Sequence, residues 1–143
     1  MTELGPAGHN APCSNKDFDF FYRGLEAGQL LVQKCSRCGV LRNPPSPACP
    51  QCHSLEWQGT EVSGRGHIHS YTVHYHPPLP GFTVPHPIAL VVMEEGVRFV
   101  GAMDGTSADR LAIDSPVAVE FVRRGGVAAF RFRLASGAGA RNV

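Results

Sequence analysis

The chain has few charged residues and almost no excess of one sign. Of its 143 residues, 17% are Asp, Glu, Lys or Arg, and the net charge is only +1. Proteins that follow a phosphate backbone usually carry a strong basic excess, so this balance argues against a nucleic-acid-binding protein. The low charge content also indicates that a partner covers some of the surface.

Long apolar runs are absent as well. No apolar run reaches the length of about 20 residues that a membrane-spanning helix needs. Residues 1–12 are polar and lack the basic-then-apolar layout of a signal peptide. We therefore expect a cytoplasmic protein with reduced thiols. Hydrophobic residues nevertheless make up 43% of the chain, enough for one domain of ordinary size with a small appendage.

Cysteine is scarce, but four of the five cysteines form two C-x₂-C pairs, Cys35 with Cys38 and Cys49 with Cys52. A C-x₂-C turn lets two thiolates reach one metal ion from one side, and a second pair completes the tetrahedron that Zn²⁺ prefers. A closed Cys₄ set leaves no position open for water or substrate. We therefore expect one structural zinc ion per chain, bound by these four residues. The fifth cysteine, Cys13, is predicted to be a bystander.

The residues around the two pairs favour a zinc ribbon. Gly39 directly follows the first pair, where a tight turn needs a residue that adopts positive φ. Pro44, Pro45 and Pro47 predict an extended loop between the pairs, because proline disrupts a helix interior. Two disulfides are the alternative. They are less favoured because the spacing suits a metal and no secretory signal is found.

An amphipathic helix is predicted before the ribbon. Ser14 is a suitable cap, Asp17 gives a capping-box-like start, and Gly28 ends the helix. Its apolar face has the helical spacing i, i+3, i+4 and i+7 and consists of Phe18, Phe21, Tyr22 and Leu25. Two interpretations of this face stay open at the level of sequence. It packs on the chain's own core, or it docks on another subunit.

The chain beyond the ribbon is predicted to be all-β. Strands are expected at residues 61–76, 88–94, 97–103, 116–123 and 127–134. Gly64 and Gly66 predict a bend or bulge near the start of the long first strand, and residues 107–111 a helical turn. Five strands of this kind, with a long bent first strand and a non-hairpin connection between the third and fourth, are typical of an OB-fold barrel.

The predicted fold class is therefore mainly β, with an N-terminal amphipathic helix, a Cys₄ zinc ribbon and a five-stranded OB-fold barrel. The expected segments are a disordered lead (1–13), a docking helix (14–29), the ribbon (30–57), the barrel (58–134) and a flexible tail (135–143).

Histidines crowd the first predicted barrel strand, at His67, His69, His74 and His76. In an unbroken strand the first two share one face and the last two share the other. Two histidines at i and i+2 can bind a metal, but no neighbouring carboxylate is present to orient the rings. A partly exposed strand face is the favoured interpretation, and an enzyme with a metal site here is the weakest hypothesis. No G-x-S-x-G, Walker or G-x-G-x-x-G motif occurs.

Several stretches together carry a resemblance to a known family: residues 20–30, 33–39, 44–52, 56–57, 62–66, 70–73, 80–82 and 88–91. The ribbon alone is generic, but Gly64-Arg65-Gly66 followed by Ser70-Tyr71-Thr72-Val73 is more specific. In this order the chain resembles the acyl-CoA-associated zinc-ribbon/OB-fold family, catalogued as a domain of unknown function. The resemblance extends from about residue 18 to residue 134.

The resemblance implies a non-catalytic accessory subunit in a hetero-oligomer. Its partner would be a thiolase-fold enzyme (a thiolase or an aldolase) or a hydratase that acts on acyl-CoA thioesters. The helix and ribbon would be a docking arm, and the barrel would face acyl-CoA. Candidate contacts are arginines for the CoA phosphates and a phenylalanine for the acyl chain, namely Arg37, Arg42, Arg65, Phe82 and Arg98. Solvated surface charges, and a cap over the barrel mouth at Phe82, are the alternatives.

A nucleic-acid-binding module is the second hypothesis, because zinc ribbons and OB folds both serve that role. Its best support is a basic cluster on the last predicted hairpin, formed by Arg123, Arg124, Arg131 and Arg133. The net charge of +1 argues against it.

Overall fold

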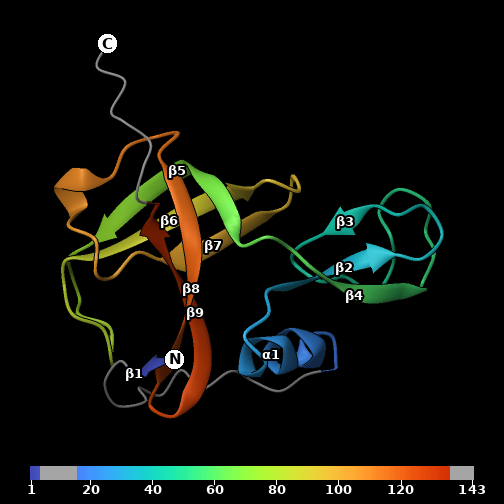
Figure 1. The fold of residues 1–143 in the computed structure, drawn as a ribbon, viewed down its shortest axis with the longest axis horizontal. Helices are drawn as coiled ribbons and strands as arrows, with labels where there is room; N and C mark the ends of the chain where they lie inside the picture. Colours follow the sequence, from blue (N-terminus) through green and yellow to red (C-terminus); the bar gives the residue numbers. More distant parts are fainter. Residues whose placement is uncertain (4–15, 136–143) are drawn as a thin grey trace.

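The computed structural model describes residues 1–3 and 16–135. The predicted disordered lead and flexible tail therefore lie almost wholly outside the described residues, as do Cys13 and Ser14. A large barrel lies beside a small three-stranded sheet, with a helix below the junction (Figure 1). Within the described part of the chain, no helix has the length and apolar character needed to cross a membrane.

Five strands close into the barrel, and they are β5 (Arg65–His74), β6 (His86–Met93), β7 (Arg98–Ala102), β8 (Pro116–Arg124) and β9 (Val127–Leu134). Their spatial order is β8-β5-β6-β7-β9, and β9 pairs back with β8. All pairs are antiparallel except β7 with β9, which is parallel. This is the predicted OB-fold barrel, so the fold class is confirmed. Its core contains Ile68, Val91, Met93, Val117 and Phe132, each no more than 2% exposed.

The strand predicted at residues 61–76 corresponds to β5 of the barrel, which is shorter at both ends. Only Glu61 of the predicted range belongs to another strand, β4 (Trp57–Glu61), which is part of the ribbon sheet. Gly64 lies between them with φ of 75°, so the bend predicted from the two glycines ends one strand and begins the next. A bulge interrupts β5 between Ile68 and Ser70. The predicted helical turn is a 3₁₀ helix at Ala108–Arg110.

The N-terminal strand has no counterpart among the predicted elements. Thr2–Glu3 form β1, which pairs in parallel with β8 at Val122 and Arg123. Two residues carry too little hydrophobic alternation to indicate a strand, so this pairing arises only from the tertiary structure.

The helix α1 spans Asp19–Glu26 and starts later than the predicted residue 14. Its N-cap is Phe18, whose side chain cannot cap, and the predicted cap lies outside the described residues. The end is as predicted. Gly28 adopts φ of 71°, the N–H of Gln29 donates to the Gly24 carbonyl at 2.8 Å, and the N–H of Gly28 donates to the Leu25 carbonyl at 3.0 Å. This is the hydrogen-bond pattern of a Schellman C-cap.

The helix contacts both the barrel and the ribbon. On the barrel side Leu25 is only 2% exposed, and the ring of Phe21 lies 6.2 Å from Phe99 and 6.1 Å from Phe130. On the ribbon side the ring of Phe20 lies 4.8 Å from that of Trp57. The first interpretation of the aromatic face, packing on the chain's own core, therefore describes Phe21 and Leu25.

Candidate metal centre and surrounding surface

The ribbon is a three-stranded antiparallel sheet of β2 (Leu31–Cys35), β3 (Leu41–Arg42) and β4, with β2 in the middle. Cys35 ends β2, and its carbonyl accepts the N–H of Gly39 at 2.9 Å. The second pair repeats this turn, because the Cys49 carbonyl accepts the N–H of His53 at 2.9 Å. Gly39 and His53 have φ of 76° and 61°. Each C-x₂-C pair, or knuckle, is thus followed by a residue with left-handed backbone conformation. Positive φ was predicted only at Gly39, after the first pair.

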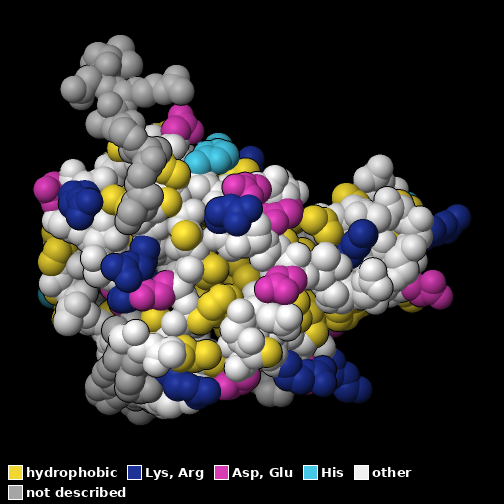
Figure 2. Space-filling model, viewed as in Figure 1, with side chains coloured by type: hydrophobic (Ala, Val, Ile, Leu, Met, Phe, Trp, Pro, Cys, Tyr) yellow, Lys and Arg dark blue, Asp and Glu magenta, His cyan; other side chains and the backbone are white. Residues whose placement is uncertain are grey.

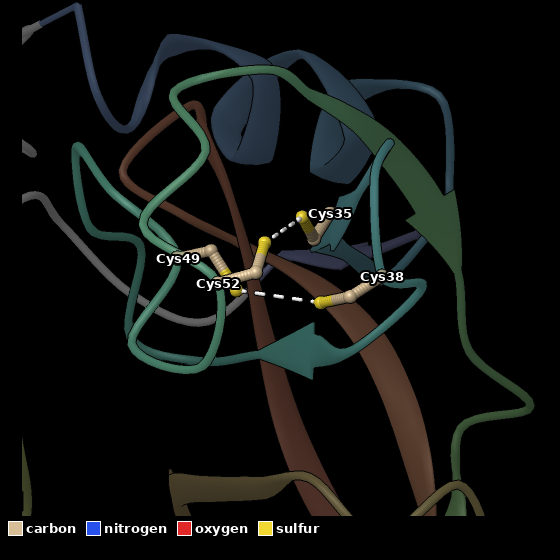
Figure 3. A group of neighbouring side chains, drawn as sticks. All are labelled: Cys35, Cys38, Cys49 and Cys52. Carbon is tan, nitrogen blue, oxygen red and sulfur yellow. Dashed lines mark hydrogen bonds between the residues drawn. The ribbon is translucent and has the colours of Figure 1, made fainter.

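The four cysteines come together at the tip of the ribbon (Figure 3). All are free thiols, and their sulfur atoms lie within 4.8 Å of one another. The Sγ atoms of Cys35 and Cys52 are 3.6 Å apart, and so are those of Cys38 and Cys49. A tetrahedral ion with Zn–S bonds of about 2.3 Å would separate its sulfur ligands by about 3.8 Å. The residues present therefore fit a tetrahedral metal ion, and the ribbon carries a Cys₄ metal-binding cluster.

The backbone around the cluster favours thiolates, which are the form that binds metal. The N–H of Cys38 is the main cause that lowers the pKa of Cys35 to about 6. Burial raises the pKa of Cys49, but the N–H groups of Cys52 and Gln51 together with the Cys38 and Cys52 thiols lower it overall. The N–H of Val40 favours the Cys38 thiolate, yet burial and the other sulfurs raise its pKa to about 12. Thiolates so close together repel one another, and a bound cation relieves that repulsion.

A buried polar cluster fixes the loop between the two cysteine pairs. The Nε of Arg42 donates to Oε1 of Gln33 at 2.6 Å, and its Nη2 donates to the Ser46 carbonyl at 3.1 Å. The Ser46 N–H donates to the same Gln33 oxygen at 2.9 Å. Arg42 and Gln33 are 7% and 1% exposed. Arg42, predicted to contact acyl-CoA, is thus an interior residue, and sequence reasoning missed Gln33 because nothing in its local pattern distinguishes it from a surface glutamine.

The other candidate acyl-CoA contacts do not converge on one site. Arg65 forms a two-pronged ion pair with Glu94, at 3.1 and 2.9 Å. Arg37 is exposed on the ribbon, and Arg98 is exposed at the start of β7. The Arg98 carbonyl accepts a hydrogen bond of 2.7 Å from the Asn43 side chain, which ties the ribbon loop to the barrel. These three arginines therefore belong to the ribbon and to the barrel end nearest to it.

Phe82 lies at the opposite end of the barrel. Its ring is 4.5 Å from the ring of His86, the first residue of β6, and 4.7 Å from the guanidinium of Arg124. Arg65 and Arg98 lie near Met93, the last residue of β6, and an eight-residue strand is about 23 Å long. An acyl-chain contact and a cap over the barrel mouth both stay predictions for Phe82.

The arginines of the last hairpin are all engaged in ion pairs. Arg123 pairs with Glu26 at 2.6 Å and Arg124 with Asp104 at 2.8 Å. Glu120 accepts from both Arg131 at 2.6 Å and Arg133 at 3.1 Å. Basic and acidic side chains are also interspersed over the face shown in Figure 2. Three carboxylates thus offset most of the charge of the four arginines, which weakens the best support for nucleic-acid binding.

The histidine-rich strand does not assemble a metal site of three or more ligands. His67 and His69 are exposed on β5, with the bulge between them. His74 pairs across the sheet with His86 and contacts the Pro77 carbonyl at 2.5 Å through Nε2. Within residues 1–3 and 16–135, the Cys₄ cluster is the only such group of three or more potential ligands.

Comparison with known proteins identifies the family to which this chain belongs. Two family models match consecutive parts of the chain, the ChsH2 rubredoxin-like zinc ribbon domain at residues 23–58 and the ChsH2 C-terminal OB-fold domain at residues 59–122. A DUF35 domain-containing scaffold protein of Pyrococcus furiosus is 34% identical over 101 residues, which are 69% of this chain and 71% of that protein. The chain belongs to the ChsH2/DUF35 family. The predicted resemblance is confirmed.

Other members of the ChsH2/DUF35 family are larger. The 3-oxo-4,17-pregnadiene-20-carboxyl-CoA hydratase alpha subunit of Mycobacterium tuberculosis is 41% identical over 120 residues, or 84% of this chain and 38% of that subunit. A probable enoyl-CoA hydratase alpha subunit of Thermomonospora curvata is 38% identical over 111 residues, 78% of this chain and 35% of that subunit. The chain thus spans little more than a third of these two relatives.

A solved structure agrees with the ChsH2/DUF35 assignment over nearly its full length. One chain of the Ltp2-ChsH2(DUF35) aldolase superimposes with a TM-score of 0.82 and 35% identity, covering 87% of this chain and 98% of that one. The Cys₄ cluster falls within the ribbon match and the barrel strands β5 to β7 within the OB-fold match.

Proposed function

We propose that this chain is a non-catalytic accessory subunit that binds a thiolase-fold or hydratase partner and supports acyl-CoA thioester metabolism. The main support for the proposal is the structural match to one chain of the Ltp2-ChsH2(DUF35) aldolase, because the match covers 98% of that chain. Two relatives are named as subunits of CoA thioester enzymes, the pregnadiene-carboxyl-CoA hydratase alpha subunit and benzoylsuccinyl-CoA thiolase subunit BbsA of Thauera aromatica. The archaeal relatives are named scaffold proteins.

The metal in this proposal is one structural Zn²⁺ ion bound by the four ribbon cysteines. Four thiolates at tetrahedral spacing close the coordination sphere, so water and substrate have no position on the metal. The ion would stabilise a small ribbon rather than take part in a reaction. Free thiols of this kind persist in a reducing compartment, which supports a cytoplasmic location.

Fewer of the predicted docking residues are accessible to a partner than the sequence indicated. Of the four proposed docking residues, Leu25 is buried, and Phe21 and Tyr22 pack against the chain's own core. A partner would therefore meet only the half-exposed parts of the three aromatic side chains. For CoA phosphates, Arg37 and Arg98 are the better candidates. Both side chains are exposed, and within the described residues neither has an ion pair.

The proposal is tested by affinity capture of the tagged full chain from its native host. Zinc is kept in all buffers, a nuclease is added, and the co-eluting proteins are identified by mass spectrometry. We expect a thiolase-fold or hydratase subunit in stoichiometric amount, and the reciprocal capture through a tag on that subunit. An eluate without such a subunit contradicts the proposal. Strongly salt-dependent binding of single-stranded oligonucleotide would favour the nucleic-acid-binding alternative instead.

A further inference from the structure

Strand β5 has one edge without a neighbouring strand over half its length. β8 pairs with β5 only from Arg65 to His67, and backbone hydrogen bonds to Ile68 extend the contact by one residue. β6 continues beside β5 as far as His74. In Figure 1, β5 crosses β8 and runs on beside β6 toward the barrel end away from the ribbon. Within the described residues, positions 69–74 therefore present N–H and C=O groups that have no strand to pair with.

Residues 69–72 of this part of β5 are open on both faces of the sheet. A strand that covers a core alternates between buried and exposed residues, because successive side chains point to opposite sides. Here His69, Ser70, Tyr71 and Thr72 are exposed one after another. The bulge after Ile68 ends the alternation, so this segment is not held by core packing on either face.

Large apolar side chains lie exposed on this strand and on the loop that follows it. They are Tyr71 at 41%, Tyr75 at 63%, Leu79 at 37% and Val84 at 39%. The chain contains no Asp, Glu, Lys or Arg from Gly66 to Met93. Proteins usually protect an exposed strand edge with charged residues or proline, and positions 69–74 carry neither. The edge is thus suited to pairing rather than protected against it.

The lack of charge also determines what can bind. Asp114 lies beside the start of the free edge, where its N–H donates to the Ile68 carbonyl at 2.8 Å. Residues 66–93 themselves contain no Asp, Glu, Lys or Arg, so they offer no formal opposite charge to a charged side chain on an incoming strand. The complementary ligand is an extended segment with apolar and neutral polar side chains. Its backbone would satisfy the free edge, and its side chains would pack on the exposed tyrosines.

We infer that the free edge of β5 at residues 69–74 is the docking site for an extended, uncharged strand of the partner subunit. This inference rests on the proposed function and names the surface that performs it. The partner strand adds to the barrel sheet beside β5 and contacts Tyr71 and Tyr75. Strand addition supplies affinity through main-chain hydrogen bonds, whereas the apolar side chains supply specificity.

Hydrogen exchange of the backbone amides tests strand addition directly. The free chain and its complex with the captured thiolase-fold or hydratase subunit are compared by mass spectrometry, with peptides that cover residues 69–74. We expect fast exchange in the free chain and at least about tenfold slower exchange in the complex for the amides that point away from β6. Slow exchange already in the free chain would mean that a second copy or another part of this chain covers the edge, which overturns the inference.

Substitutions with a matched control give a second readout. Tyr71→Lys places a charge on the proposed surface, and Val100→Lys places one on an equally apolar position of β7 that is 65% exposed. We expect the dissociation constant for the partner to rise at least about tenfold with Tyr71→Lys and to stay unchanged with Val100→Lys. Zinc content and melting temperature show that both variants are folded.

The outcomes separate the two proposals. If the partner binds but the Tyr71 variant keeps full affinity and the amides at 69–74 stay unprotected, the partner uses another surface. The inference is then wrong while the proposed function stands. If no thiolase-fold or hydratase subunit binds the unmodified chain, the proposed function fails and this inference fails with it.

Discussion

Substitution of one ribbon cysteine should prevent metal binding and unfold the ribbon. Cys38→Ser is the most informative change, because Cys38 is exposed whereas Cys35 and Cys49 are each 1% exposed and belong to the packed interior. The substitution therefore removes a metal ligand without opening a cavity. Three thiolates remain, which no longer close a tetrahedron.

The expected size of the effect follows from what else holds the ribbon together. Its fully buried aliphatic side chains are Leu30 and Val32, each 1% exposed. Their burial contributes about 1.5–3 kcal/mol apiece, whereas a structural zinc ion contributes about 10–16 kcal/mol. The ribbon should therefore unfold without the metal. The barrel should stay folded, because its core around Ile68 and Phe132 lies within its own strands.

A single tryptophan reports on this transition. The chain has one Trp, and Trp57 pairs with Cys35 on β2 and packs on Phe20 at 4.8 Å. We expect Cys38→Ser to lose the bound zinc by elemental analysis and to shift the tryptophan emission to longer wavelength. The far-UV circular dichroism of the barrel should persist. Cys13→Ser is the matched control and should keep one zinc ion per chain.

Two results would refute this reasoning. One is a Cys38→Ser variant that retains a tightly bound zinc ion, since a fourth ligand from elsewhere would then complete the site. The other is complete loss of zinc with unchanged Trp57 emission. The ribbon would then be stable without metal, and the ion would need a role other than structural support.

Three further predictions concern the barrel. Gly66→Ala should lower the free energy of unfolding by about 3 kcal/mol, because its Cβ would lie 2.3 Å from the Val92 carbonyl oxygen. Gly126→Ala, which has open space but φ of 81°, should cost only about 1 kcal/mol in the same urea titration, and the reverse order would contradict the structure. Burial lowers the pKa of His86, so below pH 6.5 the unfolded chain takes up the proton more readily and stability falls with falling pH. His86→Leu should make the melting temperature less dependent on pH between 7.5 and 5. An unchanged pH dependence would show that other titratable groups cause it. Arg131→Met removes a side chain that is 12% exposed and bridges two carboxylates, and should cost about 2 kcal/mol by thermal denaturation; no change in stability would show that the pairs are screened.

The ribbon and the barrel were predictable because their signals are local. The two C-x₂-C pairs specify the knuckle geometry within four residues, and the sulfur atoms meet as expected. The strands β8 and β9 show alternation over most of their length and begin at the predicted residues, Pro116 and Val127. Gly28 ends the helix through a turn that only its own neighbours determine.

The unpredicted features all depend on partners that are distant in sequence. Arg123 pairs with Glu26, which is 97 residues away, and nothing near either residue indicates the contact. Arg42 looks like a surface arginine until the fold places Gln33 against it.

Steady-state turnover by the captured partner shows whether this chain is a non-catalytic accessory subunit. The zinc-loaded chain is assayed alone with an acyl-CoA thioester, and the purified thiolase-fold or hydratase subunit is assayed with and without the chain. We expect no turnover by the chain alone and a rise in kcat/KM of the partner when the chain is added in equal amount. Turnover by the chain alone, or a partner whose kcat/KM is unaffected by it, would contradict the account.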